Sequence, residues 1–229
     1  FPPERIVFAG AGKTGRELEA GLNAGIFAFH VESAGELALL SRISARKGLV
    51  APVGLRVNPG VDTETPHAYT RTGHAETKFG IPVAEAEDLY RSMSEDAHLE
   101  ARGLGVHIGS QILDTAPYLR TLESVTALVD RLVAGGISLE YVDLGGGFGI
   151  SYDGEAGLDL DAFAREVIGR LKLRGLELVL EPGRAIVGEA GVLLVRVLYV
   201  KRSAGKTFVV TDGGMTDLIR PSLYQGFHR

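Results

Sequence analysis

Three short segments of the sequence carry side chains that could bind and activate a small aromatic ligand. Together they offer a carboxylate, a guanidinium, an imidazole ring, a hydroxyl and closely spaced backbone N–H groups. An aromatic, phosphorylated cofactor needs this set of groups around its ring and its phosphate. Each segment directly follows a short apolar run: Glu181-Pro182-Gly183-Arg184, His107-Ile108-Gly109-Ser110 and Gly145-Gly146-Gly147-Phe148-Gly149. The sequence therefore predicts a cofactor site where several strands end.

Each of these side chains has a specific chemical capability. Glu181 beside a pyridine nitrogen would keep that nitrogen protonated and make the ring a strong electron sink. Arg184 could hold a carboxylate or a phosphate through two parallel hydrogen bonds. Glycines 145–147 would let backbone N–H groups approach a phosphate closely. The same residues are also compatible with a surface carboxylate, a loop ion pair and an ordinary turn, and a histidine such as His107 in an apolar strand is often a core residue.

The composition favours a cytoplasmic protein that binds a small molecule. A chain of 229 residues with 45% hydrophobic content can bury one large core, and its 31 glycines suit many tight turns. The net charge is -5, and acidic and basic residues are interspersed along the sequence. We therefore expect the protein to bind neither nucleic acid nor a membrane surface. There is no cysteine for disulfides or thiolate chemistry. The first residues lack a signal-peptide pattern, and the longest apolar stretch, 190–200, is too short to span a bilayer.

Apolar runs alternate with amphipathic segments along the chain, which predicts βα units around a parallel sheet. We expect helices to begin at Thr14 and Ser33, each of which has a glutamate three residues later, and to end near glycines. The predicted strands are 6–9, 27–31, 53–57, 103–107, 141–144 and 176–180. The predicted helices are about 14–24, 34–45, 83–94, 116–134 and 158–173.

The fold class that this pattern predicts is α/β, with part of a (β/α)8 barrel followed by the start of an all-β domain. About six βα units can be identified, whereas a closed barrel of this type has eight, so we expect two further units ahead of this sequence. Beyond residue 187 the runs 192–201 and 207–211, joined by Ser203-Ala204-Gly205, indicate an antiparallel hairpin. We therefore predict a partial barrel over residues 1–187 and the beginning of a β-rich domain over residues 188–229.

Further motifs complete a pattern that extends from Ile6 to His228. They are Arg56-Val57-Asn58-Pro59, Thr77-Lys78-Phe79-Gly80, the continuation of the histidine segment to Gln111, and Asp217-Leu218-Ile219-Arg220-Pro221-Ser222-Leu223-Tyr224. In this order the motifs resemble those of the fold-type III pyridoxal-phosphate decarboxylases and, within that group, the diaminopimelate decarboxylases. The resemblance implies a barrel that binds pyridoxal 5'-phosphate, an amino acid as substrate, and a homodimer with shared active sites.

The resemblance also assigns roles to individual residues. It implies that Glu181 and His107 are catalytic, with the ring of His107 stacked on the pyridine face. It implies that the substrate is held by Arg184, Arg220 and Tyr224. The cofactor contacts that it implies are His107, Ser110, Gly145, Gly146, Gly147, Glu181, Pro182, Gly183 and Arg184.

The reaction implied by the resemblance is decarboxylation of meso-2,6-diaminopimelate to L-lysine and CO2, the last step of lysine biosynthesis. Gln111 and the second arginine motif favour this substrate over those of ornithine or arginine decarboxylases, and carboxynorspermidine decarboxylase is a further alternative. A different alternative is that the protein is a non-catalytic homologue that binds other proteins. The intact Glu181, Arg184 and His107 argue against this alternative. In this family the lysine that forms the Schiff base with the cofactor comes from a strand ahead of Phe1. We therefore expect this chain alone to be inactive, since none of its lysines matches that position: Lys13, Lys47, Lys78, Lys172, Lys201 and Lys206.

Other motifs match nucleotide or metal sites incompletely. Gly10-Ala11-Gly12-Lys13-Thr14 resembles a nucleotide-binding P-loop, but Val7 stands where that loop needs its first glycine. The glycine run that starts at Gly145 has Ile150 as the final residue of a dinucleotide-binding fingerprint. Four residues could suggest a metal, but their irregular spacing fits an active-site flap better: Asp62, His67, His74 and Glu76. We therefore predict neither a nucleotide nor a metal.

Overall fold

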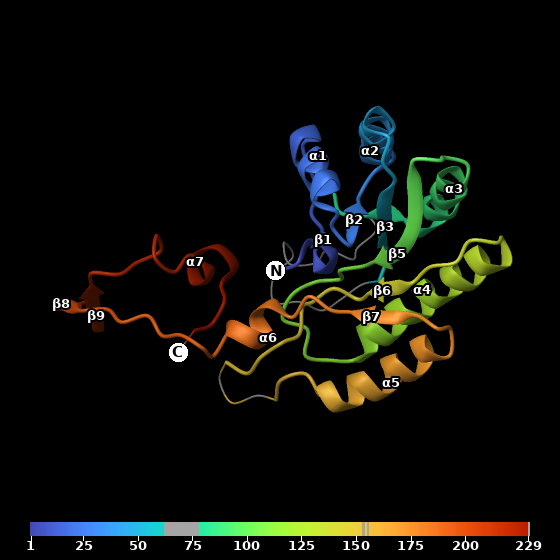
Figure 1. The fold of residues 1–229 in the computed structure, drawn as a ribbon. Coiled ribbons are helices and arrows are strands. Elements are labelled where there is room, and N and C mark those ends of the chain that lie inside the picture. The colour runs from blue at the N-terminus through green and yellow to red at the C-terminus, as the bar shows by residue number, and fades with distance from the viewer. Residues whose placement is uncertain (62–77, 153, 155, 229) are drawn as a thin grey trace.

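A parallel sheet forms the main body of the chain (Figure 1). The computed structural model describes residues 1–61, 78–152, 154 and 156–228. The strands are β1 (Val7–Phe8), β2 (Ala28–Val31), β3 (Ala51–Asn58), β4 (Ile81–Pro82), β5 (Leu99–Gly105), β6 (Tyr141–Asp143) and β7 (Glu177–Val179). Their order is β1-β2-β3-β5-β6-β7, all parallel, and the short β4 pairs with the end of β3. This arrangement confirms the predicted partial barrel.

The helices alternate with the strands and cover the outside of the sheet (Figure 1). They are α1 (Gly15–Ala24), α2 (Ala34–Lys47), α3 (Val83–Ser94), α4 (Ala116–Ala134) and α5 (Leu160–Lys172). Successive helices contact one another, α1 with α2, α3 with α4 and α4 with α5, and each of α2, α3 and α5 also packs on strands. Because helices occupy this outer side, polar residues can gather on the inner side and at the ends of the strands.

Local capping explains where the first two helices begin. The hydroxyl of Thr14 accepts a hydrogen bond from the backbone N–H of Glu17, whose carboxylate accepts one from the N–H of Thr14, which completes a capping box. At α2 the hydroxyl of Ser33 caps the N–H of Glu36 in the same way. However, the carboxylate of Glu36 binds Lys13 and the N–H of the residue before Ser33, so only half of the second box forms. Glycines in left-handed conformation end both helices, as predicted.

The six predicted strands and five predicted helices are all present, with shifts at their ends. The largest shift concerns β5, which begins at Leu99 and ends at Gly105 instead of spanning 103–107. As a result, His107 lies in the loop after the strand and not within it. Strand β4 was not predicted, because a pair of residues that includes a proline carries no alternating pattern.

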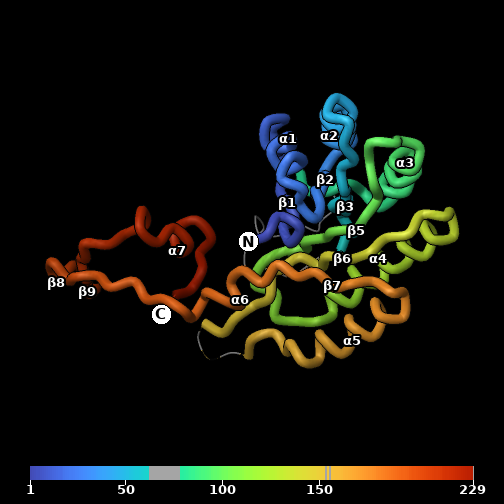
Figure 2. Tube along the Cα trace, viewed as in Figure 1, coloured from blue at the N-terminus to red at the C-terminus, as the bar shows by residue number. Residues whose placement is uncertain are grey.

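The C-terminal part contains the predicted hairpin, made of β8 (Val197–Ser203) and β9 (Lys206–Thr211). Ala204 and Gly205 form its turn, both with the positive φ values that favour a tight hairpin. The first strand begins later than the predicted residue 192. The hairpin is a separate sheet, and together with the short helix α7 (Arg220–Tyr224) it extends away from the barrel (Figure 2).

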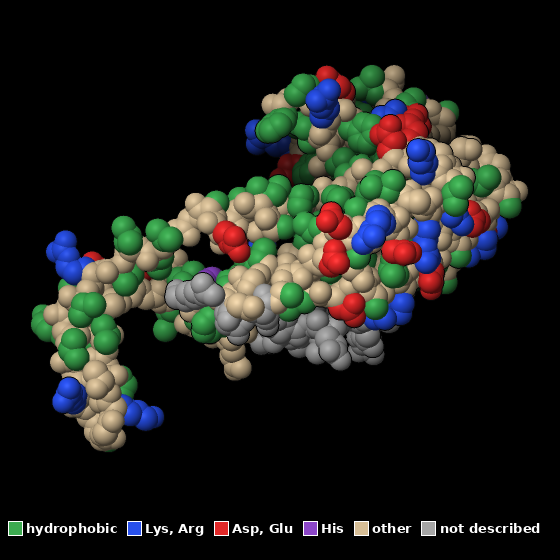
Figure 3. Space-filling view, turned by 90° about the horizontal axis from the view of Figure 1, so that it is seen from below, with side chains coloured by type: hydrophobic (Ala, Val, Ile, Leu, Met, Phe, Trp, Pro, Cys, Tyr) green, Lys and Arg blue, Asp and Glu red, His purple; other side chains and the backbone are tan. Residues whose placement is uncertain are grey.

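The hairpin carries apolar side chains on its surface, visible at the far end of the molecule in Figure 3. Val197, Tyr199 and Val209 are all more than half exposed. An isolated two-stranded hairpin is only marginally stable in water. We therefore expect these strands to depend on further packing for their stability. Within the part of the chain described here, no helix is both long and apolar enough to cross a membrane.

Candidate active site

Large polar side chains from distant strands meet on the inner side of the sheet. Tyr141 and Asp143 are two residues apart on β6 and therefore point to the same side, towards His30 of β2. The Tyr141 hydroxyl lies 2.8 Å from His30 Nε2, and Asp143 Oδ2 lies 3.8 Å from His30 Nδ1. These contacts cross β3 and β5, which lie between β2 and β6. A Cβ on Gly54 of β3 would lie 2.7 Å from the Tyr141 hydroxyl, one on Gly103 of β5 would lie 2.2 Å from the Tyr141 ring, and one on Gly105 would lie 2.6 Å from His30. Glycines on both intervening strands thus make room for this group.

His30, Tyr141 and Asp143 form the inner group of this site, and burial sets the protonation of its histidine and its acid. It lowers the pKa of His30 to about 3, with help from the cations Lys13 and Arg56, so His30 is neutral near pH 7. Burial and the nearby charge of Glu181 raise the pKa of Asp143 to about 7. Asp143 Oδ1 accepts a hydrogen bond from the N–H of the residue that begins the glycine triplet, at 2.8 Å. The other oxygen, Oδ2, is buried and has no hydrogen-bond partner among the described residues.

The loops that follow β5, β6 and β7 meet through the glycine triplet 145–147. A Cβ on Gly145 would lie 2.5 Å from the carbonyl oxygen of Val106, one on Gly146 would lie 2.0 Å from that of Glu181, and one on Gly147 would lie 2.2 Å from that of Gly109. No side chain fits at these three positions, so the triplet is required for the three loops to pack against one another.

Two of the three N–H groups of the triplet are used within the protein. Gly145 N–H donates to Asp143, and Gly146 N–H donates to Nδ1 of His107 at 3.2 Å. Gly147 N–H and the hydroxyl of Ser110 make no hydrogen bond to any described residue. These two donors, on loops that touch, fit the phosphate of a pyridoxal cofactor, although the cradle is smaller than the sequence suggested.

His107 is a neutral ring at the same edge. Burial lowers its pKa to about 4, and the charge of Arg56 acts in the same direction. Because Nδ1 accepts a hydrogen bond from Gly146, the proton of the neutral ring is on Nε2. A neutral imidazole can lie against a positively charged aromatic ring without repulsion, which fits a pyridinium.

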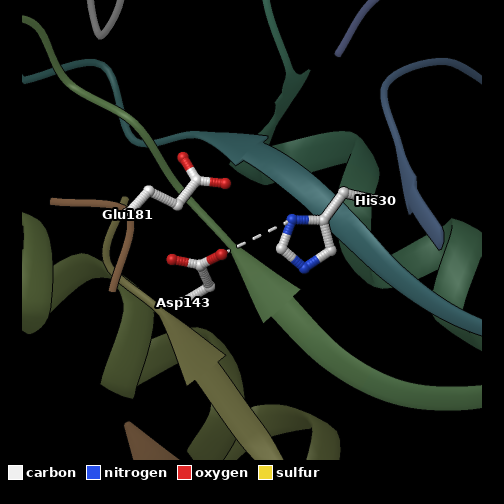
Figure 4. A group of neighbouring side chains, drawn as sticks. All are labelled: His30, Asp143 and Glu181. Carbon is white, nitrogen blue, oxygen red and sulfur yellow. Dashed lines mark ion pairs between the residues drawn. The ribbon is translucent and has the colours of Figure 1, made fainter. Parts of the chain in front are cut away.

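Glu181 lies where these loops converge, directly after β7. Its N–H donates to the carbonyl of Gly145 at 2.9 Å. Figure 4 shows its carboxylate beside His30 and Asp143. One ring nitrogen of His30 and one carboxylate oxygen from each of the two acids lie within 4.8 Å of one another. Burial raises the pKa of Glu181 although the residue keeps an exposed surface, and the cation Arg56 opposes that rise. The carboxylate thus has one side towards the inner group and one side open to a ligand.

Arg56, at the end of β3, supplies the positive charge of this region. Its guanidinium donates to Glu32 at 3.0 Å and lies over the ring of Phe79, 5.0 Å from the ring centroid. The charge of Arg56 influences the protonation of His30, His107, Asp143 and Glu181. The sequence analysis assigned no role to Arg56, although it is part of a motif noted there.

The predicted substrate-binding residues form a second group further along the chain. Arg184, on the short helix α6 (Gly183–Val187), donates to the side-chain oxygen of Gln111 at 2.9 Å. Arg220 lies over the ring of Tyr152, 4.5 Å from its centroid, and its Nη1 is 3.1 Å from His228 Nε2.

The two arginines are close enough to interact. Burial lowers the pKa of Arg220, and the charge of Arg184 adds to this effect. Tyr224 follows Arg220 by one turn of α7 and lies on the same face of that helix. The structure therefore groups Arg184 with Arg220 and places Tyr224 on the element that carries Arg220.

Sequence reasoning missed much of the inner group. His30 and Tyr141 were taken as ordinary strand residues, and their meeting depends on glycines in β3 and β5 that no local pattern marks as spacers. Asp143 offered a weak signal, since it is an acid inside an apolar strand, two residues before the glycine run. The residues that suggested a metal, Asp62, His67, His74 and Glu76, lie outside the described residues, as does Thr77.

Lys13 in the segment that resembles a P-loop is a buried structural residue. Its ammonium donates to the carbonyl oxygens of Gly10 and His30 and pairs with Glu36 at 2.8 Å. All three hydrogen atoms of the ammonium are used, and the side chain is 2% exposed. This cation therefore joins the loop before α1 to β2 and α2 and is not directed at a nucleotide.

We expect Lys13→Met to lower the free energy of unfolding by about 3 kcal/mol, because Glu36 and two carbonyl groups would lose their buried partner. The matched control is Lys47→Met, which removes a solvent-screened surface pair with Glu19 and should therefore cost much less stability. Urea unfolding of both variants checks this difference. Equal losses would show that the buried position of Lys13 is unimportant.

Comparisons with known proteins agree with this geometry. Residues 1–188 match the family model described as "Pyridoxal-dependent decarboxylase, pyridoxal binding domain". The chain is 47% identical over 225 residues to the diaminopimelate decarboxylase of Pseudomonas aeruginosa, covering 98% of this chain and 54% of that protein. It is 42% identical over 232 residues to the diaminopimelate decarboxylase of Aquifex aeolicus, covering 100% of this chain and 54% of the relative.

A solved structure gives the same picture. The crystal structure of diaminopimelate decarboxylase from Helicobacter pylori complexed with L-lysine superposes with a TM-score of 0.96 at 39% identity, covering 100% of this chain and 57% of that one. The chain thus spans about half the length of the curated relatives it matches. With the family model covering most of the chain, and with strand-end loops whose shape and donors fit the cofactor, this chain belongs to the pyridoxal-dependent decarboxylases, and its residues 1–188 match their pyridoxal-binding domain.

Proposed function

We propose that the full-length protein removes a carboxylate from meso-2,6-diaminopimelate, using pyridoxal 5'-phosphate, to give L-lysine and CO2. The observation that carries this proposal is the convergence of a neutral ring, a carboxylate and free donors at three adjacent strand ends, His107, Glu181, Ser110 and Gly147. The identity to diaminopimelate decarboxylases over nearly the whole chain supports the choice of substrate.

In this proposal the residues at the ends of β5, β6 and β7 would hold the cofactor. Its phosphate would accept hydrogen bonds from the Ser110 hydroxyl and from backbone N–H groups of the triplet 145–147, chiefly that of Gly147. The ring of His107 would lie against the pyridine face, and Glu181 would bind the ring nitrogen. Pro182 and Gly183 would shape the wall beside Glu181, because they form the turn into α6.

When bound, the cofactor supplies an electron sink for the electron pair left by the departing carboxylate. Glu181 assists by holding a proton at the ring nitrogen, because a carboxylate stabilises the positive charge there. His107 is neutral at physiological pH and therefore excludes water from the ring face without adding charge.

Arg184 and Arg220 suit a substrate that carries a second carboxylate. Arg220 contacts Tyr152 and His228, two of the residues that line a pocket of about 1020 Å³, although neither arginine is itself a lining residue. A guanidinium can bind a carboxylate through two hydrogen bonds. Arg184, Arg220 and Tyr224 would thus hold the distal end of diaminopimelate, the end that is kept in the product.

We also propose a cytoplasmic homodimer with shared active sites and a second, β-rich domain that begins near residue 188. The exposed apolar surface of the hairpin supports the existence of such a domain. Analytical ultracentrifugation of the full-length protein checks the oligomeric state, and a monomer at micromolar concentration would contradict the dimer.

We expect the full-length protein to take up pyridoxal phosphate and to gain a visible absorption band that borohydride removes while fixing the cofactor to a lysine. Ser110→Ala should weaken cofactor affinity by about 10- to 100-fold, since one charge-assisted hydrogen bond to phosphate is lost. Ser92→Ala on the exposed side of α3 is the control and should leave affinity unchanged. Absence of the band after reconstitution would contradict the proposed cofactor site.

A further inference from the structure

Asp143 is the most deeply buried acid next to the proposed cofactor site. The residue is 1% exposed, and Oδ2 has no hydrogen-bond partner among the described residues. A buried carboxylate oxygen that lacks a donor is costly when ionised, so such a group tends to keep a proton or to share one with a neighbour. The neighbours of Asp143 therefore decide its protonation.

The nearest acid is Glu181, which comes from a different strand. Its carboxylate lies beside Asp143 and His30: one carboxylate oxygen from each acid and one ring nitrogen of His30 lie within 4.8 Å of one another (Figure 4). Gly145 links the two residues: its N–H donates to the Asp143 carboxylate, and its carbonyl oxygen accepts from the backbone N–H of Glu181. The chain thus brings the backbone of Glu181 next to the Asp143 carboxylate.

The remaining charged and titratable groups around the pair do not neutralise it fully. His30 on β2 is neutral and is linked to the Tyr141 hydroxyl of β6. Arg56 on β3 is the only cation that stabilises both carboxylates in the described part of the chain, and it also pairs with Glu32, whose charge raises the pKa of Glu181. The single positive charge of Arg56 thus faces three carboxyl groups, which favours retention of a proton by one of these acids.

We propose that Asp143 is a positioning residue for the proton at this site. With Glu181 it forms a carboxylate pair that retains one proton near neutral pH, and this pair keeps the ring nitrogen of the cofactor protonated. The effect of this pair on the ring nitrogen rests on the proposed function, whereas the coupling of the two carboxylates does not. In the pair without cofactor, the proton is shared between one oxygen of Asp143 and one oxygen of Glu181. With cofactor, Glu181 binds the protonated ring nitrogen, and the negative charge of Asp143 opposes loss of that proton.

The test compares Asp143→Asn with wild type in the full-length protein. The amide keeps the size of the side chain and an oxygen that can accept from Gly145 N–H, but it removes the charge. Glu140→Gln is the matched control, because Glu140 directly precedes β6 at the end opposite Asp143 and its exposed carboxylate pairs with Arg102.

The first readout is the titration of Glu181 in cofactor-free protein, followed by 13C NMR of labelled glutamate carboxyl groups and assigned through Glu181→Gln. In wild type we expect Glu181 to titrate in two steps, because its charge depends on that of Asp143. In Asp143→Asn we expect a single step whose midpoint lies about 1 to 2 pH units below the upper step of wild type. Glu140→Gln should behave like wild type.

The second readout is the absorption spectrum of the bound cofactor as a function of pH. Asp143→Asn should lower the pH at which the ring nitrogen loses its proton by a similar amount, a shift that a purely structural role would not cause. Identical titrations of Glu181 in wild type, Asp143→Asn and Glu140→Gln would overturn the proposed pair even if the cofactor binds normally. If wild type binds no cofactor, the proposed function and the ring-nitrogen half of the inference both fail, while the cofactor-free titration still decides whether the carboxylates are coupled.

Discussion

Glu181→Gln is expected to lower kcat for decarboxylation by roughly 100- to 1000-fold while the cofactor remains bound. The amide occupies the same place after β7 but cannot stabilise a protonated ring nitrogen, so the ring becomes a weaker electron sink. The raised pKa of Glu181 and its position at the meeting of three loops are the features that support this role. Single-turnover kinetics together with the cofactor absorption spectrum separate loss of chemistry from loss of cofactor.

The matched control for this variant is Glu177→Gln, at the exposed opposite end of the same strand. It should change kcat by less than twofold. A Glu181→Gln protein with near-normal turnover would show that this carboxylate has a different role, and a protein that loses the cofactor altogether would indicate a binding role instead.

Arg184→Ala and Arg220→Ala are each expected to lower kcat/KM for diaminopimelate by roughly 30- to 1000-fold, mostly through a higher KM. The loss corresponds to about 2 to 4 kcal/mol, because the substrate carboxylate would be left without its charge-assisted partner. Arg184→Lys should recover part of the affinity, since a point charge remains but the two parallel hydrogen bonds do not. Steady-state kinetics of the variants measure these changes.

Arg165→Ala on the outer helix α5 is the control and should leave KM unchanged. Thermal unfolding of all variants excludes a general loss of structure. If Arg220→Ala leaves KM unaltered, the stacking on Tyr152 and the contact with His228 are structural, and the distal carboxylate is bound elsewhere.

The sequence predicted the elements of this fold well, because their signals are local. The alternation of apolar and amphipathic segments located six strands and five helices of the partial barrel but not the short β4 and α6, and the helices 83–94 and 116–134 were predicted with the bounds that the structure shows. Capping at Ser33 was predicted only in part, because Lys13 from a distant segment binds the glutamate that would have completed the box. The division of the chain near residue 187 stays a prediction.

The site was predicted where its residues follow strands and belong to recognisable motifs, as His107, Ser110 and Glu181 do. It was not predicted where the chemistry depends on long-range packing. His30 and Asp143 meet only because glycines on β3 and β5 leave space between β2 and β6, a relation that no spacing in the sequence shows. The glycine triplet follows a strand as expected, whereas its role in binding a phosphate stays a prediction; its tight packing with two neighbouring loops leaves fewer free N–H groups than its composition suggests.

The most direct test of the proposed function is release of CO2 by the full-length protein reconstituted with pyridoxal phosphate, measured in parallel with meso-diaminopimelate, lysine, ornithine and arginine. The account predicts rapid release from diaminopimelate with equimolar L-lysine as product, and release at least roughly 100-fold slower from the other three, which lack a distal carboxylate. Preference for ornithine, arginine or lysine would contradict the assignment of Arg184 and Arg220 to that carboxylate, and no release from any amino acid would contradict the proposed decarboxylase activity.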